Sequence, residues 1–451
     1  MAIRSQSLGA LAPALVVLSL VAACEREVIL SGQRFEVRTP LDASAAAEAG
    51  TNVILPEAQP NRAVPFAAGA PVVNADWTHR AGTPAHAMPH AALSPAPQRI
   101  WSVSIGAGDS RRHRITTAPV VGGGRVFAMD SASRVTAVSP EGGVLWTFDA
   151  VPPGEASGSA SGGGLAYGEG RLFVTTGYGE LIALDPASGT PVWRQRFEAP
   201  VTAAPTVAGG TVFVSSRDSA GWAVSAADGR QRWVISAVPS TSGVAGPASP
   251  AVDGGTVVFP FGSGEIIAAT RDRGVTQWNA PVAGQRAGRA IGYVTDITGD
   301  PVIRDGTVYV GSNGGRTAAL DLATGARRWD VGEGAQGPVW VGGGAVFLVN
   351  DENRLVRLDS RTGERIWATD LPFFRRDNVR RQRHIVPHYG PVLAGGRLVV
   401  VSSEGAMTLF DPVDGSETAR LALPASAAAP PAVAGGALYV VTTNGQLHAF
   451  R

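Results

Sequence analysis

Few residues in this chain have the types and spacing that catalysis or metal binding requires. The 451 residues include one cysteine, Cys24, and they contain neither an H-E-x-x-H nor a C-x-x-C-H sequence. His79, His86 and His90 lie close together in the chain, but no cysteine or acidic residue accompanies them at a spacing typical of metal sites. The glycine-rich stretches are typical of hairpin turns rather than of phosphate-binding loops. The sequence therefore predicts no catalytic residues, no metal site and no bound cofactor.

The single cysteine suggests a covalent modification instead. Residues 1–23 contain one early basic residue, Arg4, and an apolar run that ends in small residues directly before Cys24. This layout is typical of a secretory signal peptide, and the sequence VAAC resembles a bacterial lipobox, whose cysteine is acylated and becomes the mature N-terminus. Each buried methylene contributes about 0.8 kcal/mol, so several acyl chains would hold the protein on a membrane. We expect lipidation at Cys24; a retained anchor or an ordinary signal peptide with an unmodified cysteine are the alternatives.

Two arginine-rich segments are candidates for binding anionic groups. They read RRHR at residues 111–114 and FFRRDNVRRQRH at residues 373–384. Guanidinium groups suit carboxylates and phosphates, and Phe373 and Phe374 could anchor an interface. The simpler alternative is a pair of solvated loops, since clustered charges are often only that. A formal net charge of +1 gives no case for nucleic-acid binding.

A repeated unit fills most of the chain and must position these segments. The copy at residues 337–370 contains a glycine turn, two apolar runs, a Thr-Gly turn and a tryptophan four residues after that glycine. The same order returns at residues 118–149, 163–198, 203–236, 248–282, 299–332, 390–423 and 430–451. A period of roughly 40 to 50 residues is typical of repeat proteins. The β-branched and aromatic runs, glycine turns and lack of an apolar period of 3.6 predict four short antiparallel strands per copy and no helices.

We therefore expect an all-β fold, an eight-bladed β-propeller of four-stranded antiparallel blades over residues 97–451. The last copy stops after three strands, and residues 97–105 would supply the missing fourth strand and close the ring. The seventh copy has Ala419 where the others have tryptophan. Large aromatic rings at such positions are expected to pack between blades. The predicted blade-docking residues are Trp101, Trp146, Trp193, Trp233, Trp278, Trp329 and Trp367.

Residues 24–96 precede the repeats and differ from them in composition. We interpret them as the lipidated N-terminus and a mostly disordered tether, because the first part is too poor in apolar residues to offset the entropy of ordering. The later part contains Trp77, which we expect to pin this arm onto the propeller.

Long connections are predicted on one face of the ring. They lie at residues 107–117, 150–161, 237–247, 283–298 and 371–388, and each joins the fourth strand of one copy to the first strand of the next. Because strands alternate in direction, these connections emerge on one face together with the loops between second and third strands. Function in such scaffolds lies in loops held by a rigid frame. This face, which includes both arginine-rich segments, is the expected binding surface.

The repeats also carry a family resemblance. The segments LDLATGARRW at residues 320–329 and LDPASGTPVW at residues 184–193 resemble the tryptophan-docking repeat of the quinoprotein alcohol dehydrogenase superfamily, whose members are eight-bladed propellers. With the VAAC motif, residues 97–451 are similar to the BamB family of outer-membrane assembly lipoproteins, which has these PQQ-like repeats. Superfamily members that oxidise alcohols bind pyrroloquinoline quinone and calcium, commonly beside a disulfide of adjacent cysteines. This chain has only Cys24, which argues against an enzyme.

The BamB resemblance implies a non-catalytic scaffold that is a monomer within the BAM complex. It would be lipid-anchored at the periplasmic face of the outer membrane, where Glu25 after the cysteine suits export in similar lipoproteins. It would bind the POTRA domains of BamA and other BAM subunits, could contact nascent outer-membrane proteins, and would assist β-barrel insertion. A PQQ-dependent quinoprotein dehydrogenase and a cell-envelope propeller lipoprotein with another partner are the alternatives.

The resemblance also implies contact residues. In the family, BamA is contacted by a loop bearing leucine and arginine and by two aspartates in the next connection. Here the first loop, residues 239–250, has Val244 at an apolar position and Ala245 where the arginine would stand. The second, residues 293–301, retains Asp296 but has Thr298 at the second acidic position. The expected partner-binding residues are Val244, Asp296 and Ile297, and the arginines that could substitute for the missing one, Arg375, Arg376, Arg380 and Arg381.

Overall fold

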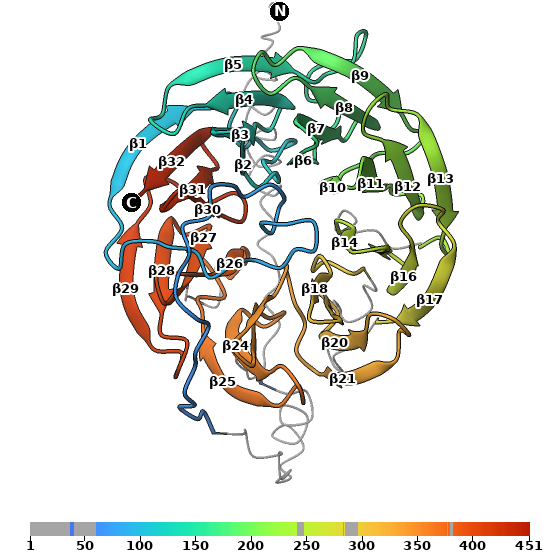
Figure 1. Ribbon diagram of the computed structural model, residues 1–451. Coiled ribbons are helices and arrows are strands. Elements are labelled where there is room, and N and C mark those ends of the chain that lie inside the picture. Colours follow the sequence, from blue (N-terminus) through green and yellow to red (C-terminus); the bar gives the residue numbers. More distant parts are fainter. Residues whose placement is uncertain are drawn as a thin grey trace, which may run out of the picture. The chain divides into compact units, whose positions relative to one another are not determined.

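The repeat copies form eight four-stranded antiparallel sheets arranged around a common axis (Figure 1). This arrangement is seen in a computed structural model, which describes residues 37–39, 60–240, 248–282, 284, 296–376, 378 and 382–451. These residues contain no helix, and hence none long and apolar enough to cross a membrane. The compact unit that carries the ring comprises residues 57–451. The predicted all-β, eight-bladed propeller with four-stranded antiparallel blades is confirmed.

Each blade runs from a short strand near the axis to an outer strand at the rim (Figure 1). Blades 1 to 4 consist of β2 (Val120–Gly122), β3 (Arg125–Met129), β4 (Arg134–Val138) and β5 (Val144–Asp149); β6 (Gly163–Gly168), β7 (Arg171–Thr176), β8 (Glu180–Leu184) and β9 (Pro191–Arg196); β10 (Thr206–Ala208), β11 (Thr211–Ser215), β12 (Ala220–Ser225) and β13 (Gln231–Ser236); and β14 (Ala251–Asp253), β15 (Thr256–Pro260), β16 (Glu265–Thr270) and β17 (Thr276–Pro281).

Blades 5 to 8 continue in the same order around the ring. They consist of β18 (Val302–Arg304), β19 (Thr307–Ser312), β20 (Arg316–Asp321) and β21 (Arg327–Val331); β22 (Trp340–Gly342), β23 (Ala345–Val349), β24 (Arg354–Asp359) and β25 (Arg365–Asp370); β26 (His388–Ala394), β27 (Arg397–Ser402), β28 (Ala406–Phe410) and β29 (Glu417–Ala422); and β30 (Ala432–Ala434), β31 (Ala437–Thr442), β32 (Gln446–Phe450) and β1 (Arg99–Ser104). In blade 8, β1 pairs with β32 antiparallel, so strands from opposite ends of the ring share one sheet.

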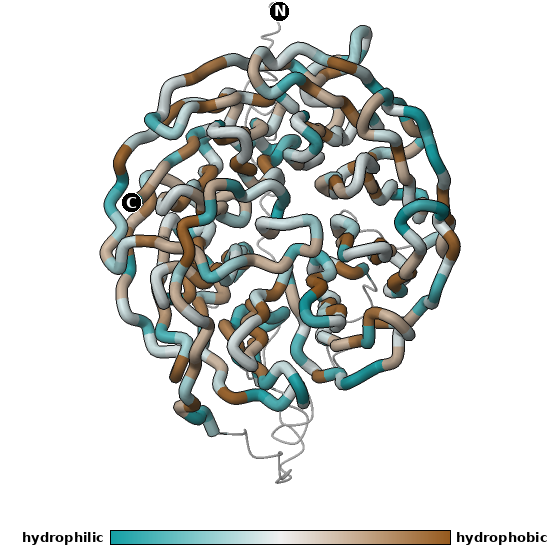
Figure 2. Tube along the Cα trace, viewed as in Figure 1, coloured by the Kyte–Doolittle hydropathy of each residue, from teal (hydrophilic) through white to brown (hydrophobic). Residues whose placement is uncertain are grey.

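The core lies between neighbouring blades. The second strands are almost fully buried, as in β11 and β23, because both faces of each sheet are covered by another sheet. The fourth strands instead alternate between exposed and half-buried positions, as in β5 and β13, because only their inward side chains meet a neighbour. Hydrophobic and hydrophilic segments accordingly alternate within every blade (Figure 2).

Neighbouring blades are joined by contacts between a tryptophan and a glycine. Trp193 of β9 packs on Gly229, in the turn between β12 and β13 of the next blade, where an added Cβ would lie 2.7 Å from the indole Cε3. Six other tryptophans pack on a turn glycine in the same way. Each indole Nε1 donates to a carbonyl of that turn: Trp101 to Pro140 (2.8 Å), Trp146 to Pro186 (3.0 Å), Trp193 to Ala226 (3.1 Å), Trp233 to Arg271 (3.2 Å), Trp278 to Leu322 (2.8 Å), Trp329 to Ser360 (2.9 Å) and Trp367 to Pro412 (3.2 Å).

The presence of alanine instead of tryptophan at position 419 has a structural explanation. Ala419 lies in β29 of blade 7, and its neighbour is blade 8, whose third and fourth strands come from the two ends of the ring. No turn joins β32 to β1; Gln98 and Arg451 exchange two main-chain hydrogen bonds there instead, at 2.7 and 2.8 Å. A tryptophan in β29 would therefore find no turn glycine to pack on.

Residues 60–96, here called the arm, start at the outer strand of blade 6, where Arg62 N donates to Ile366 O, and then run to the inner strands near the axis (Figure 1). The arm contacts the blades in ring order, each time with a hydrogen bond. These bonds are Gly435 N to Asn74 O (2.8 Å, blade 8), Val121 N to Trp77 O (2.8 Å, blade 1), Tyr167 N to Thr78 O (2.8 Å, blade 2), Val207 N to His79 Nε2 (3.0 Å, blade 3), Val252 N to Pro84 O (2.8 Å, blade 4), Ile303 N to Ala85 O (2.8 Å, blade 5), Trp340 Nε1 to Pro89 O (3.4 Å, blade 6) and Ala91 N to Leu393 O (3.2 Å, blade 7).

The arm provides hydrogen-bond partners for main-chain groups at the inner edge of nearly every sheet. The first strand of a blade would otherwise leave main-chain groups unpaired beside the axis, and buried unpaired groups are costly. Trp77, His79 and His86 of the arm are buried, with 0 to 2% of their surface exposed. The packed region thus begins before residue 97, where the sequence placed the start of the propeller. Main-chain hydrogen bonds and a few buried side chains, such as Trp77, Met88 and Leu93, hold the arm, and these contacts leave no repeated pattern in the sequence.

Replacing a turn glycine by alanine should distinguish two effects on stability, the clash with the docked tryptophan and the strain of the left-handed backbone. Gly229 (φ +77°) and Gly344 (φ +74°) share a left-handed conformation, but only Gly229 lies under an indole ring; Gly344 has nothing within 4 Å of an added Cβ. Both alanine variants should lose about 1 kcal/mol from the left-handed backbone, and G229A should lose about 1–3 kcal/mol more from overpacking. Urea unfolding of both variants measures the difference. Equal losses would contradict the docking role of Trp193.

Buried His79 should make the stability of the protein depend on pH. Burial, assisted by the nearby charge of His86, lowers the pKa of His79 from 6.5 to about 3. Because the folded pKa lies below the unfolded one, this stabilisation is complete above about pH 6.5 and is lost as the pH falls toward 3.

The free energy of unfolding should therefore fall between pH 6.5 and 5, with His79 contributing about 1.4 kcal/mol per pH unit. The variant H79Q should have a shallower slope by that amount, whereas H384Q, at an exposed position, should keep the slope of the unchanged protein. Urea titrations at four pH values measure both slopes. Identical slopes for all three proteins would show that His79 does not stay neutral.

Candidate functional site

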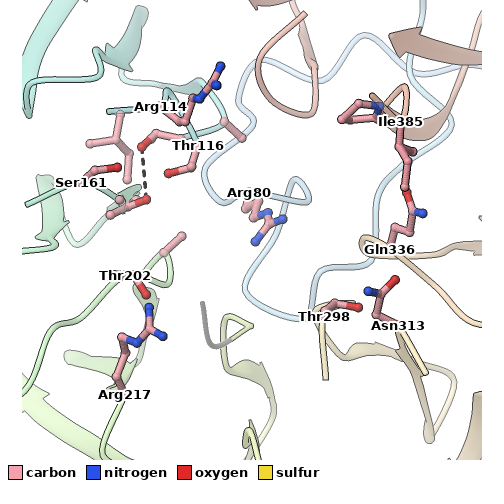
Figure 3. Close-up of a pocket in the computed structure, with 18 of the residues that line it drawn as sticks. Arg80, Arg114, Thr116, Ser161, Thr202, Arg217, Thr298, Asn313, Gln336 and Ile385 are labelled. Carbon is pink, nitrogen blue, oxygen red and sulfur yellow. Dashed lines mark hydrogen bonds between the residues drawn. The ribbon is translucent and has the colours of Figure 1, made fainter. Parts of the chain in front are cut away.

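A cavity of about 820 Å³ lies at the axis of the propeller. Its walls come from the connections between blades, such as Thr116, Ser161 and Thr202, and from loops between second and third strands, such as Asn313. Both kinds of segment emerge on the face that carries the long connections, so the cavity opens there. Figure 3 shows these side chains around a central Arg80, which the arm contributes.

Arg80 is positioned by a buried carboxylate. Its Nε lies 3.3 Å from Oδ2 of Asp300, and its Nη1 lies 3.4 Å from Oδ1. The Asp300 side chain is fully buried, and its Oδ1 also accepts a hydrogen bond from Ser249 N at 2.7 Å. The Arg80 side chain remains 24% exposed, toward the cavity. A buried carboxylate needs such a partner, so this ion pair fixes the arm to blades 4 and 5.

Two further arginines line the cavity. Arg114, in the connection between β1 and β2, pairs with Asp109 at 3.2 Å and keeps 64% of its side chain exposed. Arg217 comes from the loop between β11 and β12 and is exposed. Burial raises the pKa of nearby Tyr389 to about 12, and the charge of Asp109 adds to this effect. Tyr389 therefore stays neutral beside the ion pair of Arg114 and Asp109.

The two ends of the second arginine-rich segment pair antiparallel at the cavity rim, and the described residues 373–376 and 382–386 are here called the hairpin. Arg375 N donates to His384 O at 3.0 Å, Val386 N donates to Phe373 O at 2.9 Å, and the rings of Phe373 and Phe374 meet edge to face at 4.9 Å. Phe373 and Ile385 line the cavity. Arg375 and Arg376 are exposed to solvent. Both arginine-rich segments thus lie at one cavity, although they are far apart in the sequence.

The other expected contact residues have different surroundings. Asp296 and Ile297 are buried, with 3% and 2% of their surface exposed, and Ile297 forms a bridge to Ser312. Their side chains could reach a partner only after a local rearrangement. Four residues expected to bind a lipid or a partner lie outside the described residues: Cys24, Val244, Arg380 and Arg381.

Sequence reasoning missed Arg80 and Asp300. They are 220 residues apart in the chain; Asp300 lies in the expected contact loop at residues 293–301 but was not singled out there, and Arg80 belongs to no recognisable motif. The only signal was that the segment around Trp77 was expected to pack on the propeller. Which blade its neighbours would meet could not be read from spacing, because the arm crosses several blades within a few residues.

The described residues do not fit a quinone and calcium centre. Within the part of the chain that the structure describes, no three His, Cys, Asp or Glu side chains gather in a group that could hold a metal ion. At the axis, Asp300 is already paired with Arg80, and the chain has no pair of adjacent cysteines. No step of quinone chemistry can be assigned to these residues.

The family model and the curated relatives that match this chain name the same family. The family model for outer membrane protein assembly factor BamB matches residues 131–369 and 375–451. Proteins of that name from Yersinia pestis and Burkholderia pseudomallei are 26% and 25% identical over 364 and 357 residues, covering 79% and 78% of this chain and 89% and 88% of theirs.

Solved structures show the same fold. BamB from Moraxella catarrhalis superposes with a TM-score of 0.66 at 19% identity, covering 79% of this chain and 100% of that chain. The quinohemoprotein alcohol dehydrogenase from Comamonas testosteroni gives 0.63 at 16% identity, covering 83% and 80%. At such identities these likenesses establish the fold alone. The family match spans more than half of the chain and confirms the resemblance found in the repeats, so the chain belongs to the BamB family of outer membrane protein assembly factors.

Proposed function

We propose that this protein is a non-catalytic scaffold lipoprotein of the outer-membrane β-barrel assembly machinery. It binds the POTRA domains of BamA and, with the other subunits, assists the insertion of β-barrel proteins into the outer membrane. The observation that carries this proposal is the match of residues 131–369 and 375–451 to a family named for outer membrane protein assembly. A rigid ring with long connections on one face suits a scaffold, because such loops can vary without disturbing the core.

The contact surface we propose is the face with the long connections. Arg375 and Arg376 support this choice, because both are exposed and belong to a hairpin whose ends are fixed by main-chain hydrogen bonds. Arginine forks pair well with carboxylates at protein interfaces. Asp296 and Ile297 remain candidate contacts, but their burial means that the adjoining connection must move for them to take part. Val244, Arg380 and Arg381 complete the proposed set.

Two alternatives remain distinct from this scaffold role. A PQQ-dependent dehydrogenase is favoured only by the fold it shares with quinohemoprotein alcohol dehydrogenase, and the described residues do not fit its cofactor. A cell-envelope lipoprotein with another partner would use the same face. Crosslinking in cells distinguishes the second alternative, since the scaffold role requires BamA among the captured proteins.

Reversing charge on the hairpin should weaken partner binding. The double variant R375E/R376E should bind purified POTRA domains about tenfold or more weakly, because like charges replace charge-assisted contacts. Isothermal titration calorimetry measures the affinity. The matched control is R230E, at a side chain 87% exposed in the turn between β12 and β13, on the opposite face. If R230E weakens binding as much as the double variant does, the proposed contact face is wrong.

Removing the cysteine should release the protein from the membrane. The variant C24S has no thiol to acylate, so the protein should lose palmitate labelling and appear in the soluble fraction after membrane washing. Ala23→Ser keeps a small residue before the cysteine and should remain membrane-bound. Fractionation followed by immunoblotting gives the readout. Retention of C24S in the outer membrane would rule out lipidation as the anchor.

A further inference from the structure

One docking tryptophan has an unusual neighbour on the third strand of its own blade. Trp367 of β25 pairs directly with Arg357 of β24. The other six docking tryptophans each pair with an alanine at that position, namely Ala449, Ala137, Ala183, Ala223, Ala268 and Ala319. Arg357 is only 2% exposed, and burying a cation is costly unless hydrogen bonds satisfy it. Blade 6 therefore needs acceptors that the other blades do not need.

The outer part of the arm supplies two of these acceptors. Arg357 Nη1 donates to Val64 O at 2.6 Å, and Nη2 donates to Pro65 O at 3.1 Å. Nη1 also donates to Pro412 O and Val413 O, at 3.1 and 3.3 Å, in the turn between β28 and β29 of blade 7. Within the described part of the chain, all hydrogen bonds of this guanidinium are made to main-chain carbonyls. Arg357 thus holds the main chain of the arm between two blades, as Figure 1 shows.

An aromatic contact fixes the arm in the same place. Phe66 of the arm packs edge to face on Phe347 and Trp340 of blade 6, with ring centroids 5.2 and 6.0 Å apart. The guanidinium carbon of Arg357 lies 5.4 Å from the centre of the Phe66 ring, which is typical of a cation–π contact. Arg357, Phe347, Trp340 and the turn of blade 7 thus form the walls of a groove, here called the 6–7 groove.

Two further residues of the arm pair with the outer strand of blade 6. The Asn61 side chain accepts from Ala368 N and donates to Ala368 O, both at 3.0 Å. Arg62 N donates to Ile366 O at 3.0 Å, and the Arg62 side chain pairs with Glu364 at 2.8 Å. Hydrogen bonding to the edge of a sheet is a common way for a protein to bind an extended peptide. These contacts set the register of the arm along β25.

The sequence of the arm favours the extended conformation that the 6–7 groove holds. Half-buried and exposed residues alternate along it: Val64, Phe66 and Ala68 are half-buried, and Ala63, Pro65 and Ala67 are exposed. This alternation is typical of an extended strand. Pro65 fixes its own φ and disfavours a helical conformation at Val64. The segment is therefore partly preorganised and loses little entropy when it binds.

Comparison with other blades shows what the arm covers. Ile366, directly before Trp367, is 5% exposed and belongs to the apolar cluster against which Val64 and Phe66 pack. The residues before the docking tryptophans of blades 8, 1 and 2 are Ile100, Leu145 and Val192, and they are 45, 48 and 47% exposed. Without the arm, the 6–7 groove would be an open apolar surface with one arginine in it.

We propose that the 6–7 groove is a recognition site for an extended peptide with a Val-Pro-Phe core preceded by Asn-Arg, and that residues 61–66 occupy it as a ligand from the same chain. Tight turns border the groove, so it lies away from the long connections and from the proposed contact face for BamA. A separate peptide must compete with the arm, whose attachment to the ring gives it an effective concentration on the order of 1 mM. Such a peptide binds well only when the arm itself is weakened.

The test uses the full mature protein with the substitutions N61A and F66A, which weaken the arm and leave the groove unchanged. Fluorescence anisotropy measures the binding of a labelled peptide with the sequence of residues 60–69, PNRAVPFAAG. The N61A/F66A protein should bind this peptide at least about tenfold more tightly than the unchanged protein does, because its arm competes less. A peptide of the same composition in scrambled order should bind at least about tenfold more weakly than PNRAVPFAAG.

Two neighbouring glycines provide a matched pair of groove variants in the N61A/F66A background. Gly343 (φ +58°) lies under the arm, where an added Cβ would be 2.7 Å from Ala67 O, whereas Gly344 (φ +74°) has nothing within 4 Å of an added Cβ. G343A should therefore weaken peptide binding about tenfold, and G344A should leave it unchanged. R357Q should also weaken it about tenfold, because it removes charge-assisted hydrogen bonds to the peptide carbonyls.

Three results would overturn the proposal. They are equal binding of the two peptides, binding to the unchanged protein as tight as to N61A/F66A, and equal affinity of the G343A and G344A variants. The glycine pair leaves Arg357 in place, so it decides the question even if R357Q does not fold. None of these measurements involves BamA, so they are independent of the scaffold role.

Discussion

The contact between a tryptophan of one blade and a turn glycine of the next is the interaction on which the ring depends. An indole ring can lie flat on the turn only where no Cβ intervenes, and its Nε1 then reaches a carbonyl of the same turn. Seven such contacts link the blades, and they stop where blade 8 is assembled from two ends of the ring. Ala419 takes the tryptophan position next to blade 8, because a docking tryptophan can pack only where a turn glycine faces it. The repeat pattern and its single exception therefore have one physical cause.

The arm provides hydrogen-bond partners for main-chain groups that the blades leave unpaired at the axis. Each innermost strand presents main-chain groups to the centre of the ring, and side chains alone do not satisfy them. The arm supplies hydrogen-bond partners to successive blades from residues 74 to 91, and the buried pair of Arg80 and Asp300 fixes it near blades 4 and 5. His79 contributes a neutral ring nitrogen to the same network. The arm, which covers one end of the axis, thereby also forms the inner end of the cavity.

These two features divide the molecule into a fixed frame and one accessible face. The tight turns and the arm occupy the far face, whereas the long connections surround the cavity on the other. The exposed Arg375 and Arg376 of the hairpin and the partly buried Arg80 of the cavity lie on this face at different depths.

The sequence by itself determined the fold class, the number of blades, the strands in each and the position of the docking tryptophans. These features depend on local patterns, namely strand periodicity and turn glycines, that recur in every copy. It also placed both arginine-rich segments on one face, since strand direction alternates. Only the tertiary structure decided that Asp296 and Ile297 are buried, that the arm packs from residue 60 onward, and that Arg80 meets Asp300 from 220 residues away. Those outcomes rest on main-chain hydrogen bonds and ion pairs between distant residues, which leave no periodic trace in the chain.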